Sequence, residues 1–437
     1  MKFDSQLSRV ASRVRELSAS CPFGFWFLTD LHVPSNHGES APMLARLVAD
    51  TGLRTVVCGG DVPEAFGDRA SLDSSIARYR EHWVASVERA GGEFFPLRGN
   101  HDLAIRFSPD SPDGFTYPAD ETRRILLDTA AVRSRAVVDP GSCAYFADFP
   151  EVRFRLVVAD TSDSVTTERP YWGVEESMSA RQSGWLADNA LATLPDGWNV
   201  VVASHIPLAG VAACDNDKAH FAEFRAALEA FRPHGGGRVA LALSGHVHAE
   251  LQSCVAGIWH VAEPCDAAYL DYINRSAPWC PDLPVKERGV WAGQTFDAVQ
   301  VDPLRGLVHF TRVGGGGDRT LHLGRLALRV GETLRLSAPC APALQRAGDP
   351  VVWGAYDADR AVPRPNPARK YDYFTDYFKT VADVARDGAL RAISPGEAVA
   401  VSRSADGVRE FFPLVVAAHG TSLASGAAGH GTDEVNA

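Results

Sequence analysis

The sequence predicts an α/β sandwich followed by a smaller, mostly β region. Two observations support this fold class. Apolar runs of strand length alternate with helix-length segments through about residue 257, and such alternation is typical of α/β proteins. After Gly257 the pattern changes to short strand-like pieces separated by glycine and proline turns, which indicates β structure without intervening helices.

The composition is that of an ordinary globular protein and excludes several other classes. Of 437 residues, 46% are hydrophobic and 22% are charged, which excludes a disordered or collagen-like chain. No apolar run reaches the roughly 18 residues that a membrane span needs, so we expect no membrane partner. The net charge of -11 argues against binding to nucleic acid through overall positive charge. The oligomeric state stays open.

The first 22 residues predict an amphipathic helix, because Phe3, Leu7, Val10, Val14 and Leu17 fall at helical spacing. Charged residues between them interrupt the apolar stretch that a signal peptide needs. The eight cysteines are scattered and include no CxxC pair, as is typical of reduced thiols. We therefore expect a cytoplasmic protein. Only five of the 43 basic residues are lysines, which suggests a GC-rich bacterial genome.

Six apolar runs before Gly257 predict strands, and most are continuous, as expected for strands that are covered on both faces. These runs span residues 25–28, 55–58, 93–97, 154–159, 199–203 and 239–243. Between them lie segments with the pattern of helices, at residues 41–51, 71–90, 119–127, 179–192 and 219–231.

The region after Gly257 predicts strands at residues 258–262, 296–301, 307–313, 326–330, 333–336, 351–355, 398–402 and 410–416. An insertion rich in Trp, Pro and Cys occupies about 264–294. Four glycines at 314–317 predict a flexible joint. We divide the chain into an N-terminal helix, a main domain, a mostly β accessory domain and a disordered tail, at residues 1–22, 23–316, 320–418 and 419–437.

Polar side chains follow five of the predicted strands, at the point where each strand ends. They are Asp30 and His32, then Asp61, then Asn100, His101 and Asp102, then His205, and finally His246 and His248. In open α/β sheets, ligands bind outside the carboxyl ends of the strands. We therefore expect these side chains to lie at one edge.

Seven of these residues carry atoms that bind divalent metal ions. The oxygen donors are Asp30, Asp61 and Asn100, and the imidazole donors are His32, His205, His246 and His248. One catalytic zinc ion usually takes three protein ligands, so seven ligands suit two ions with one bridging carboxylate. The donor set admits Mn²⁺, Fe²⁺/Fe³⁺ or Zn²⁺, as well as Co or Ni, so the sequence does not select the metal.

In this order, these residues resemble the calcineurin-like metallophosphoesterase superfamily. The motifs are Asp30-Leu31-His32, Gly60-Asp61, Gly99-Asn100-His101-Asp102, a lone His205 and Gly245-His246-Val247-His248. The family pattern is DxH, GDxxD or GDxxE, GNHD or GNHE, a single His and GHxH, and Glu64 fits the GDxxE variant. The resemblance covers roughly residues 23–313 and implies a four-layer αββα sandwich.

The resemblance also implies a role for each position. One metal would be held by Asp30, His32 and His248, and the other by Asn100, His205 and His246, with Asp61 bridging them. His101 would donate a proton to the leaving oxygen, and Asp102 would orient His101. The implied activity is that of a metal-dependent phosphoric ester hydrolase, in which a bridging hydroxide attacks a small-molecule phosphomonoester or phosphodiester.

Several alternatives stay open within and outside that class. The enzyme could be a nucleotidase or a cyclic-nucleotide phosphodiesterase, or the fold could serve as a non-catalytic scaffold. The complete ligand set argues against a scaffold. The segment from Gly60 to Ala65 matches neither the GDxVDRG motif of protein serine/threonine phosphatases nor the GDxxY motif of purple acid phosphatases.

For a few other polar residues we prefer a structural interpretation. Asp160 ends a strand and suits a turn or a helix cap. Arg98 could reach a phosphate, but a structural salt bridge is at least as good an interpretation. His37, His220 and His260 have no spacing that indicates a ligand, although His260 lies on a predicted strand and could reach the mouth of the site.

Overall fold

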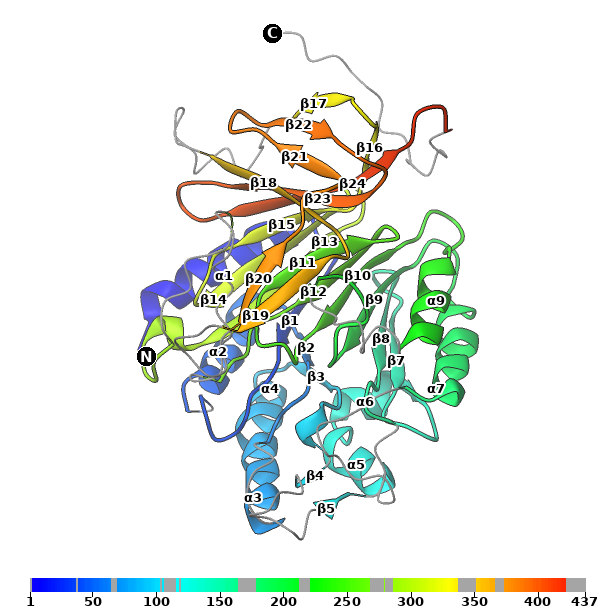
Figure 1. Ribbon diagram of the computed structural model, residues 1–437. Helices are drawn as coiled ribbons and strands as arrows, with labels where there is room; N and C mark the ends of the chain where they lie inside the picture. The colour runs from blue at the N-terminus through cyan, green and yellow to red at the C-terminus, as the bar shows by residue number, and fades with distance from the viewer. Residues whose placement is uncertain are drawn as a thin grey trace.

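Two β-sheets packed face to face form the centre of the protein in the computed structural model (Figure 1). The structure describes residues 2–36, 38–63, 69–102, 104–105, 115–117, 119–163, 178–211, 221–267, 279, 286–336, 351–365 and 373–421.

The first sheet contains strands from both ends of the chain, in the order β18-β23-β24-β15-β14-β13-β1-β2-β3, with β16 paired to β24. At one end of this sheet β1, β2 and β3 are parallel, and β13 is antiparallel to β1. The strands are β1 (Phe23–Leu28), β2 (Thr55–Cys58), β3 (Glu93–Pro96), β13 (Thr295–Asp302), β14 (Leu307–Gly314), β15 (Arg319–His322), β16 (Leu326–Arg329), β18 (Val352–Asp357), β23 (Gly396–Arg403) and β24 (Arg409–Ala417).

The second sheet has the order β11-β12-β10-β9-β8-β7-β6. Its strands β12, β10, β9 and β8 are parallel neighbours. The strands are β6 (Ala136–Val138), β7 (Tyr145–Phe149), β8 (Phe154–Ala159), β9 (Asn199–Ser204), β10 (Val239–Ser244), β11 (Leu251–Val255) and β12 (Ile258–Ala262).

The main hydrophobic core lies between the two sheets. Phe25 and Phe27 from β1 belong to the same buried cluster as Leu156 from β8, Val201 from β9 and Leu241 from β10. Each of these side chains is fully buried, which explains why the parallel strands appear in the sequence as continuous apolar runs.

Helices cover the outer face of each sheet, so the layers are αββα (Figure 1). The first sheet is covered by α1 (Asp4–Ser18), α2 (Ser40–Thr51) and the consecutive helical segments α3 (Arg69–Tyr79), η1 (Arg80–Val84) and α4 (Ala85–Arg89). The second sheet is covered by α7 (Ala180–Trp185), η3 (Leu186–Leu191) and α9 (Ala222–Ala230). The predicted α/β sandwich with a mostly β C-terminal region is therefore confirmed.

The remaining elements are short. They are α5 (Ala119–Leu126), α6 (Ala130–Arg135), η2 (Asn100–Asp102), η4 (Trp291–Gly293), the pairs β4 (Ala104–Ile105) with β5 (Phe115–Thr116) and β19 (Ala361–Pro365) with β20 (Tyr373–Tyr377), and the three-stranded sheet of β17 (Thr333–Arg335), β22 (Ala389–Ala392) and β21 (Ala382–Val384). Within the described residues, no helix combines the length and the apolar character that crossing a membrane requires.

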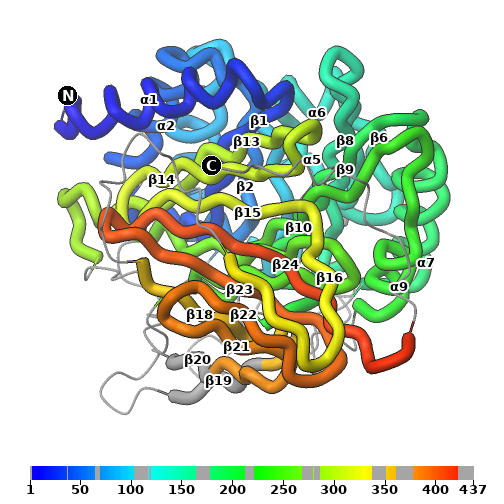
Figure 2. The backbone as a smooth tube through the Cα atoms, turned by 90° about the horizontal axis from the view of Figure 1, so that it is seen from above, coloured from blue at the N-terminus to red at the C-terminus, as the bar shows by residue number. Residues whose placement is uncertain are grey.

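The four glycines at 314–317 connect two hydrogen-bonded strands instead of forming a free joint. Gly314 is the last residue of β14, and the Gly315 N–H donates to Gln294 O over 3.0 Å. After this turn β15 pairs with both β14 and β24, so C-terminal strands extend the first sheet (Figure 2). The domain boundary between residues 316 and 320 stays a prediction, and residues 422–437 of the predicted tail lie outside the described residues.

A buried network of charges connects these C-terminal strands to the rest of the sandwich. It consists of Arg312, Arg319, Arg409, Glu250, Glu263 and Asp297. Arg312 Nη2 lies 2.8 Å from Glu250 Oε2, and Arg409 pairs with the same carboxylate. Burial raises the pKa of Glu250, but the surrounding arginines outweigh burial and lower this pKa well below its usual range. Glu250 is therefore ionised, and its charge depends on these partners.

Candidate metal centre

The carboxyl ends of β1, β2, β3, β9 and β10 bring the predicted ligands to one place. Hydrogen bonds between backbones join the loops that follow these strands. The Asp30 N–H donates to Gly60 O over 2.9 Å, and the His32 N–H donates to Asp61 O over 3.0 Å. In the second sheet, the Gly245 N–H donates to His205 O over 2.9 Å. Backbone hydrogen bonds thus join the loop after β1 to the loop after β2, and the loop after β9 to the loop after β10.

One group of donor atoms is formed by Asp30, His32, Asp61 and His248, whose ligand atoms lie within 4.8 Å of one another. Asp30 Oδ1 is 3.0 Å from His248 Nε2. His32 Nε2 is 3.4 Å from His248 Nε2. All four side chains are buried, and they come from three loops of two different sheets.

A second group of donor atoms is formed by Asp61, His205 and His246. Asp61 Oδ2 is 3.1 Å from His205 Nε2. Asn100 belongs to the same cluster, because its Oδ1 lies 2.9 Å from His205 Nε2 and 3.1 Å from His246 Nδ1. Asp61 is therefore the residue that the two groups share.

These distances fit side chains that surround metal ions. Two ligand atoms at 2.0–2.2 Å from one ion stand about 2.8–3.6 Å apart at octahedral or tetrahedral angles. The distances from His248 Nε2 to Asp30 and His32, and those from Asn100 Oδ1 to its two histidines, are all between 2.9 and 3.4 Å. Carboxylate, amide and imidazole donors together suit a borderline divalent ion.

The backbone is strained at most of these positions. Eight non-glycine residues among the described ones have positive φ, and five of them are predicted ligands. These five are Asp30 (φ 54°), His32 (φ 40°), Asp61 (φ 51°), His246 (φ 67°) and His248 (φ 52°). A left-handed conformation costs roughly 1–3 kcal/mol per residue and is concentrated at functional sites, where the surrounding structure enforces it.

Two glycines allow the loops to come this close. A Cβ atom on Gly99 would overlap the Asp61 carboxylate, and one on Gly245 would overlap Thr29 and the Asp30 carboxylate. The position of each glycine directly before a predicted ligand, as in Gly99-Asn100 and Gly245-His246, thus has a steric reason.

The electrostatics of the site favour cations. Burial raises the pKa of Asp30, but His248 outweighs it and the pKa is lowered to about 2. Burial likewise raises the pKa of Asp61, but His205 holds it well below its usual range. Two ionised carboxylates are thus buried side by side, and a divalent cation would compensate their charge.

The histidines differ in charge. Burial lowers the pKa of His32 to about 3, so its ring is neutral at pH 7, which is the form that binds metal. Burial also lowers the pKa of His205, but Asp61 outweighs burial and the pKa rises to about 10. The His205 Nδ1 atom lies 2.7 Å from Gly59 O, a contact that directs Nε2 into the site. A bound cation would displace the proton from this ring.

His101 and Asp102 occupy different places. His101 is the more exposed, with 20% of its side chain accessible, and its Nε2 is 3.9 Å from Asp61 Oδ2. Asp102 is buried behind the loops and accepts hydrogen bonds from the backbone N–H groups of Gly99, Asp61 and Val62, over 2.6, 3.0 and 2.7 Å. Both Asp102 oxygens therefore hold the loops together, and the role of Asp102 in orienting His101 stays a prediction.

Other predicted structural residues behave as expected. Arg98 Nε lies 2.9 Å from Asp160 Oδ1, and both side chains are buried, so the salt bridge is the correct interpretation of Arg98. Asp160 also accepts from the backbone N–H groups of Cys143 and Ser162. His37, Glu64 and His220 lie outside the described residues.

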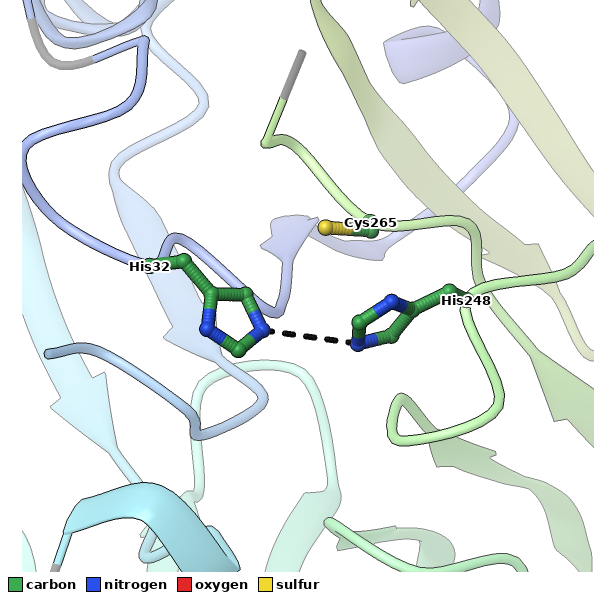
Figure 3. Close-up of side chains that lie close together, drawn as sticks. All are labelled: His32, His248 and Cys265. Atoms are coloured by element: carbon green, nitrogen blue, oxygen red, sulfur yellow. Dashed lines mark hydrogen bonds between the residues drawn. The ribbon is translucent and has the colours of Figure 1, made fainter. Parts of the chain in front are cut away.

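The sequence interpretation missed Cys265, whose sulfur lies within 4.8 Å of ligand atoms of His32 and His248 (Figure 3). It follows β12, which is a parallel neighbour of β10. The sequence contained a signal for this residue, because a strand was predicted at residues 258–262, directly before it. Cys265 was missed because no polar motif follows this strand and the residues after it were assigned to an insertion.

Comparisons with known proteins identify the family of the chain. The model of one family, calcineurin-like phosphoesterase, matches residues 23–250. No curated protein matches the chain. Similar solved structures include GAP50, the anchor in the inner membrane complex of Plasmodium, with 13% identity and a TM-score of 0.38 over 66% of this chain and 84% of that chain.

Two further similar structures are enzymes by their descriptions. Phosphopantetheinyl hydrolase from Mycobacterium tuberculosis has 13% identity and a TM-score of 0.29 over 55% of this chain and 89% of that chain. A putative 5'-nucleotidase from Staphylococcus aureus has 12% identity and a TM-score of 0.35 over 69% of this chain and 54% of that chain.

Proposed function

Because the chain belongs to the calcineurin-like phosphoesterase family, we propose that it is a phosphoric ester hydrolase that uses two divalent metal ions. The observation that carries this proposal is the pair of donor groups that share Asp61. One ion would be held by Asp30, His32 and His248, and the other by Asn100, His205 and His246, with Asp61 between them. The ions are Mn²⁺, Fe²⁺/Fe³⁺ or Zn²⁺ by the chemistry of the donors.

When bound, two such ions neutralise the charge of a phosphoester and activate a water molecule for attack on phosphorus. The chain provides the geometry for this chemistry. The hydrogen-bonded loops and the three amides held by Asp102 fix the ligands in advance. No serine or cysteine nucleophile is required.

His101 supplies the proton in this proposal. Its backbone N–H donates to Asp61 Oδ1 over 2.8 Å, so the residue is anchored to the shared carboxylate. Its ring centroid is 5.1 Å from that of His32 and its side chain is 20% exposed, which supports a position at the edge where substrate would enter. A general acid at this position protonates the leaving oxygen and contributes roughly 10²–10⁴-fold to the rate.

The substrate in this proposal is a small phosphomonoester or phosphodiester. The acidic balance of the chain, with a net charge of -11, disfavours a nucleic acid held by bulk charge. A cyclic-nucleotide phosphodiesterase and a nucleotidase are the more specific forms of the proposal. The absence of nucleic-acid and membrane partners and the cytoplasmic location stay predictions.

Hydrolysis of p-nitrophenyl phosphate and of bis(p-nitrophenyl) phosphate tests the proposal. The metal-depleted protein is assayed before and after addition of Mn²⁺ or Zn²⁺, with bound metal measured in the same samples. We expect metal-dependent release of p-nitrophenol from at least one ester. Two bound ions without turnover of either ester would favour a scaffold, and the ratio of the two rates separates monoesterase from diesterase.

A further inference from the structure

We propose that Cys265 is an additional, sulfur ligand of the ion that Asp30, His32 and His248 would hold, and that it biases this ion toward Zn²⁺, Fe²⁺ or Co²⁺. The inference rests on the proposed dinuclear centre and specifies the composition of one of its two sites.

The fold delivers Cys265 to the edge of the sheet where the histidines lie. β12 pairs in parallel with β10, and Ser244 is the register partner of Ala262. The pairing continues past the strand, because the Glu263 N–H donates to Ser244 O over 2.9 Å. The chain after β10 reaches His246 and His248, and the chain after β12 reaches Cys265. Both turns therefore leave the same edge side by side.

The segment that carries Cys265 is held against the loop after β1. The Asp266 N–H donates to Thr29 O over 3.1 Å, and the Ala267 N–H donates to Asp30 O over 3.3 Å. The Asp266 side chain accepts from Ser40 Oγ and from the Thr295 N–H, each over 3.0 Å. The segment is thus held both by the loop after β1 and by Ser40 and Thr295, and these contacts fix the position of the sulfur.

The sulfur lies with metal-binding atoms. Cys265 is fully buried, and its Sγ is within 4.8 Å of ligand nitrogens of His32 and His248. That limit is about twice a metal–ligand distance of 2.0–2.3 Å, so the three atoms can surround one ion. Figure 3 shows the sulfur near the two imidazole rings, whose Nε2 atoms lie 3.4 Å apart.

The two histidines connect this thiol to the predicted site. His32 and His248 belong both to the group with Cys265 and to the group with Asp30 and Asp61. The two groups therefore share two histidines, and in this proposal Cys265 adds a ligand to the ion that these histidines would hold. The Sγ atom also donates to Asp30 O over 3.0 Å and accepts from the Ala267 N–H over 3.1 Å, and these contacts hold the thiol beside the loop that carries Asp30 and His32.

The other described free cysteines have different surroundings. Cys21, Cys58, Cys143 and Cys254 are buried, and none of them belongs to a described group of potential metal ligands. Burial raises the pKa of Cys143 to about 12 and raises that of Cys254 further, as expected for thiols that pack as small apolar groups. Cys254 therefore serves as a matched control for Cys265.

Coordination converts the thiol to a thiolate. As the cation binds, the S–H bond of Cys265 breaks, its proton is released to solvent, and the sulfur lone pair forms the bond to the metal. Thiolate is a soft donor that favours zinc, iron and cobalt over manganese and magnesium. The predicted set of oxygen and nitrogen ligands has a weaker preference of this kind.

Cobalt provides a direct test, because thiolate bonded to Co²⁺ gives a near-ultraviolet charge-transfer absorption that oxygen and nitrogen ligands do not give. The full-length apoprotein is titrated with Co²⁺, and bound cobalt is measured by elemental analysis. We expect the absorption in the wild-type protein and in C254A. We expect C265S and C265A to bind cobalt but to lack the absorption.

Metal preference provides a second readout. We expect C265S to lower the ratio of Zn²⁺ to Mn²⁺ affinity by about tenfold or more relative to wild type and C254A. Bound cobalt without charge-transfer absorption in the wild-type protein would overturn the assignment of Cys265 and leave the dinuclear centre standing, as would a band that persists in both Cys265 variants. Failure of the wild-type protein to bind Co²⁺ at all would overturn the dinuclear proposal and this inference together. Absence of the band from the cobalt-loaded wild-type protein decides against Cys265 even where a variant does not fold.

Discussion

At the scale of single residues, the ligand types could be predicted from the sequence, but their supports could not. The seven predicted ligands follow strands, and the structure brings all of them together. Asp102 was expected to orient His101, and the structure shows in addition that it accepts hydrogen bonds from the amides of Gly99, Asp61 and Val62. Hydrogen bonds to backbone amides cannot be predicted from residue types, because almost every residue has the same backbone N–H group. Cys265 was missed because a single cysteine forms no motif.

Substitution of His101 tests its proposed role as the proton donor. We expect His101→Ala to keep both metal ions and to lose roughly 10²–10⁴-fold in kcat on an alkyl phosphate, which has a poor leaving group. The loss on p-nitrophenyl phosphate is expected to be smaller, because that leaving group needs no proton. His234→Ala, at an exposed position, is the control. Full activity of His101→Ala on the alkyl ester would refute the role.

Substitution of Asp61 tests whether one carboxylate serves both donor groups. We expect Asp61→Ala to lose at least one bound ion per chain in elemental analysis, because Asp61 belongs to both groups. Asp387→Ala removes an exposed carboxylate from the C-terminal region and is expected to keep the wild-type metal content. An Asp61→Ala protein with two tightly bound ions would contradict the bridging assignment.

At the scale of elements, buried parallel strands were the easiest to predict. The predicted strands at 55–58, 154–159 and 258–262 coincide with β2, β8 and β12, since a continuous apolar run is a strong signal. β15 was missed. It is only four residues long and contains Arg319, which pairs with buried acids from distant strands. A charged side chain in a short segment indicates an exposed position, and its burial can be predicted only when its ion-pair partners are known.

The buried charge network predicts a large effect of one C-terminal side chain. Arg409→Leu leaves Glu250 with one partner fewer in a fully buried position, and we expect it to lower the free energy of unfolding by roughly 3–5 kcal/mol. Arg335→Leu removes an exposed pair with Asp387 and is expected to cost roughly 0–1 kcal/mol. Urea unfolding of both variants measures the difference. Equal effects would mean that the network contributes no more than a surface pair.

At the scale of the whole molecule, the α/β sandwich follows from the sequence pattern and its αββα layers from the family resemblance, whereas the way the C-terminal strands extend the first sheet follows from neither. The glycines at 314–317 suggested a break in the chain. The parallel pairing of β15 with β24 joins segments far apart in the sequence, and its register depends on the whole sheet. Local patterns contain no information about such partners.

The pH dependence of stability is a property of the whole molecule to which His260 contributes. This residue on β12 is buried, and among the described residues neither of its ring nitrogens has a hydrogen-bond partner. Burial lowers its pKa from 6.5 to about 4. A histidine whose pKa is lowered by folding binds its proton more readily when unfolded, so stability is lost as the pH falls from about 6.5 toward 4.

The contribution of His260 can be isolated by comparison with His260→Leu at matched metal content. We expect the free energy of unfolding of the wild-type protein to fall by about 3 kcal/mol more than that of the variant between pH 7 and pH 4. Urea unfolding at each pH measures this difference. Parallel pH profiles of the two proteins would show that the ring is not buried in its neutral form.

The dinuclear centre is tested most directly by a crystal structure of the manganese-loaded protein with anomalous diffraction data. The account predicts two anomalous peaks about 3.5–4 Å apart, with the Asp61 carboxylate between them and the remaining six predicted ligands divided three and three. A single peak, or imidazoles and carboxylates that point away from one another with no metal among them, would contradict it.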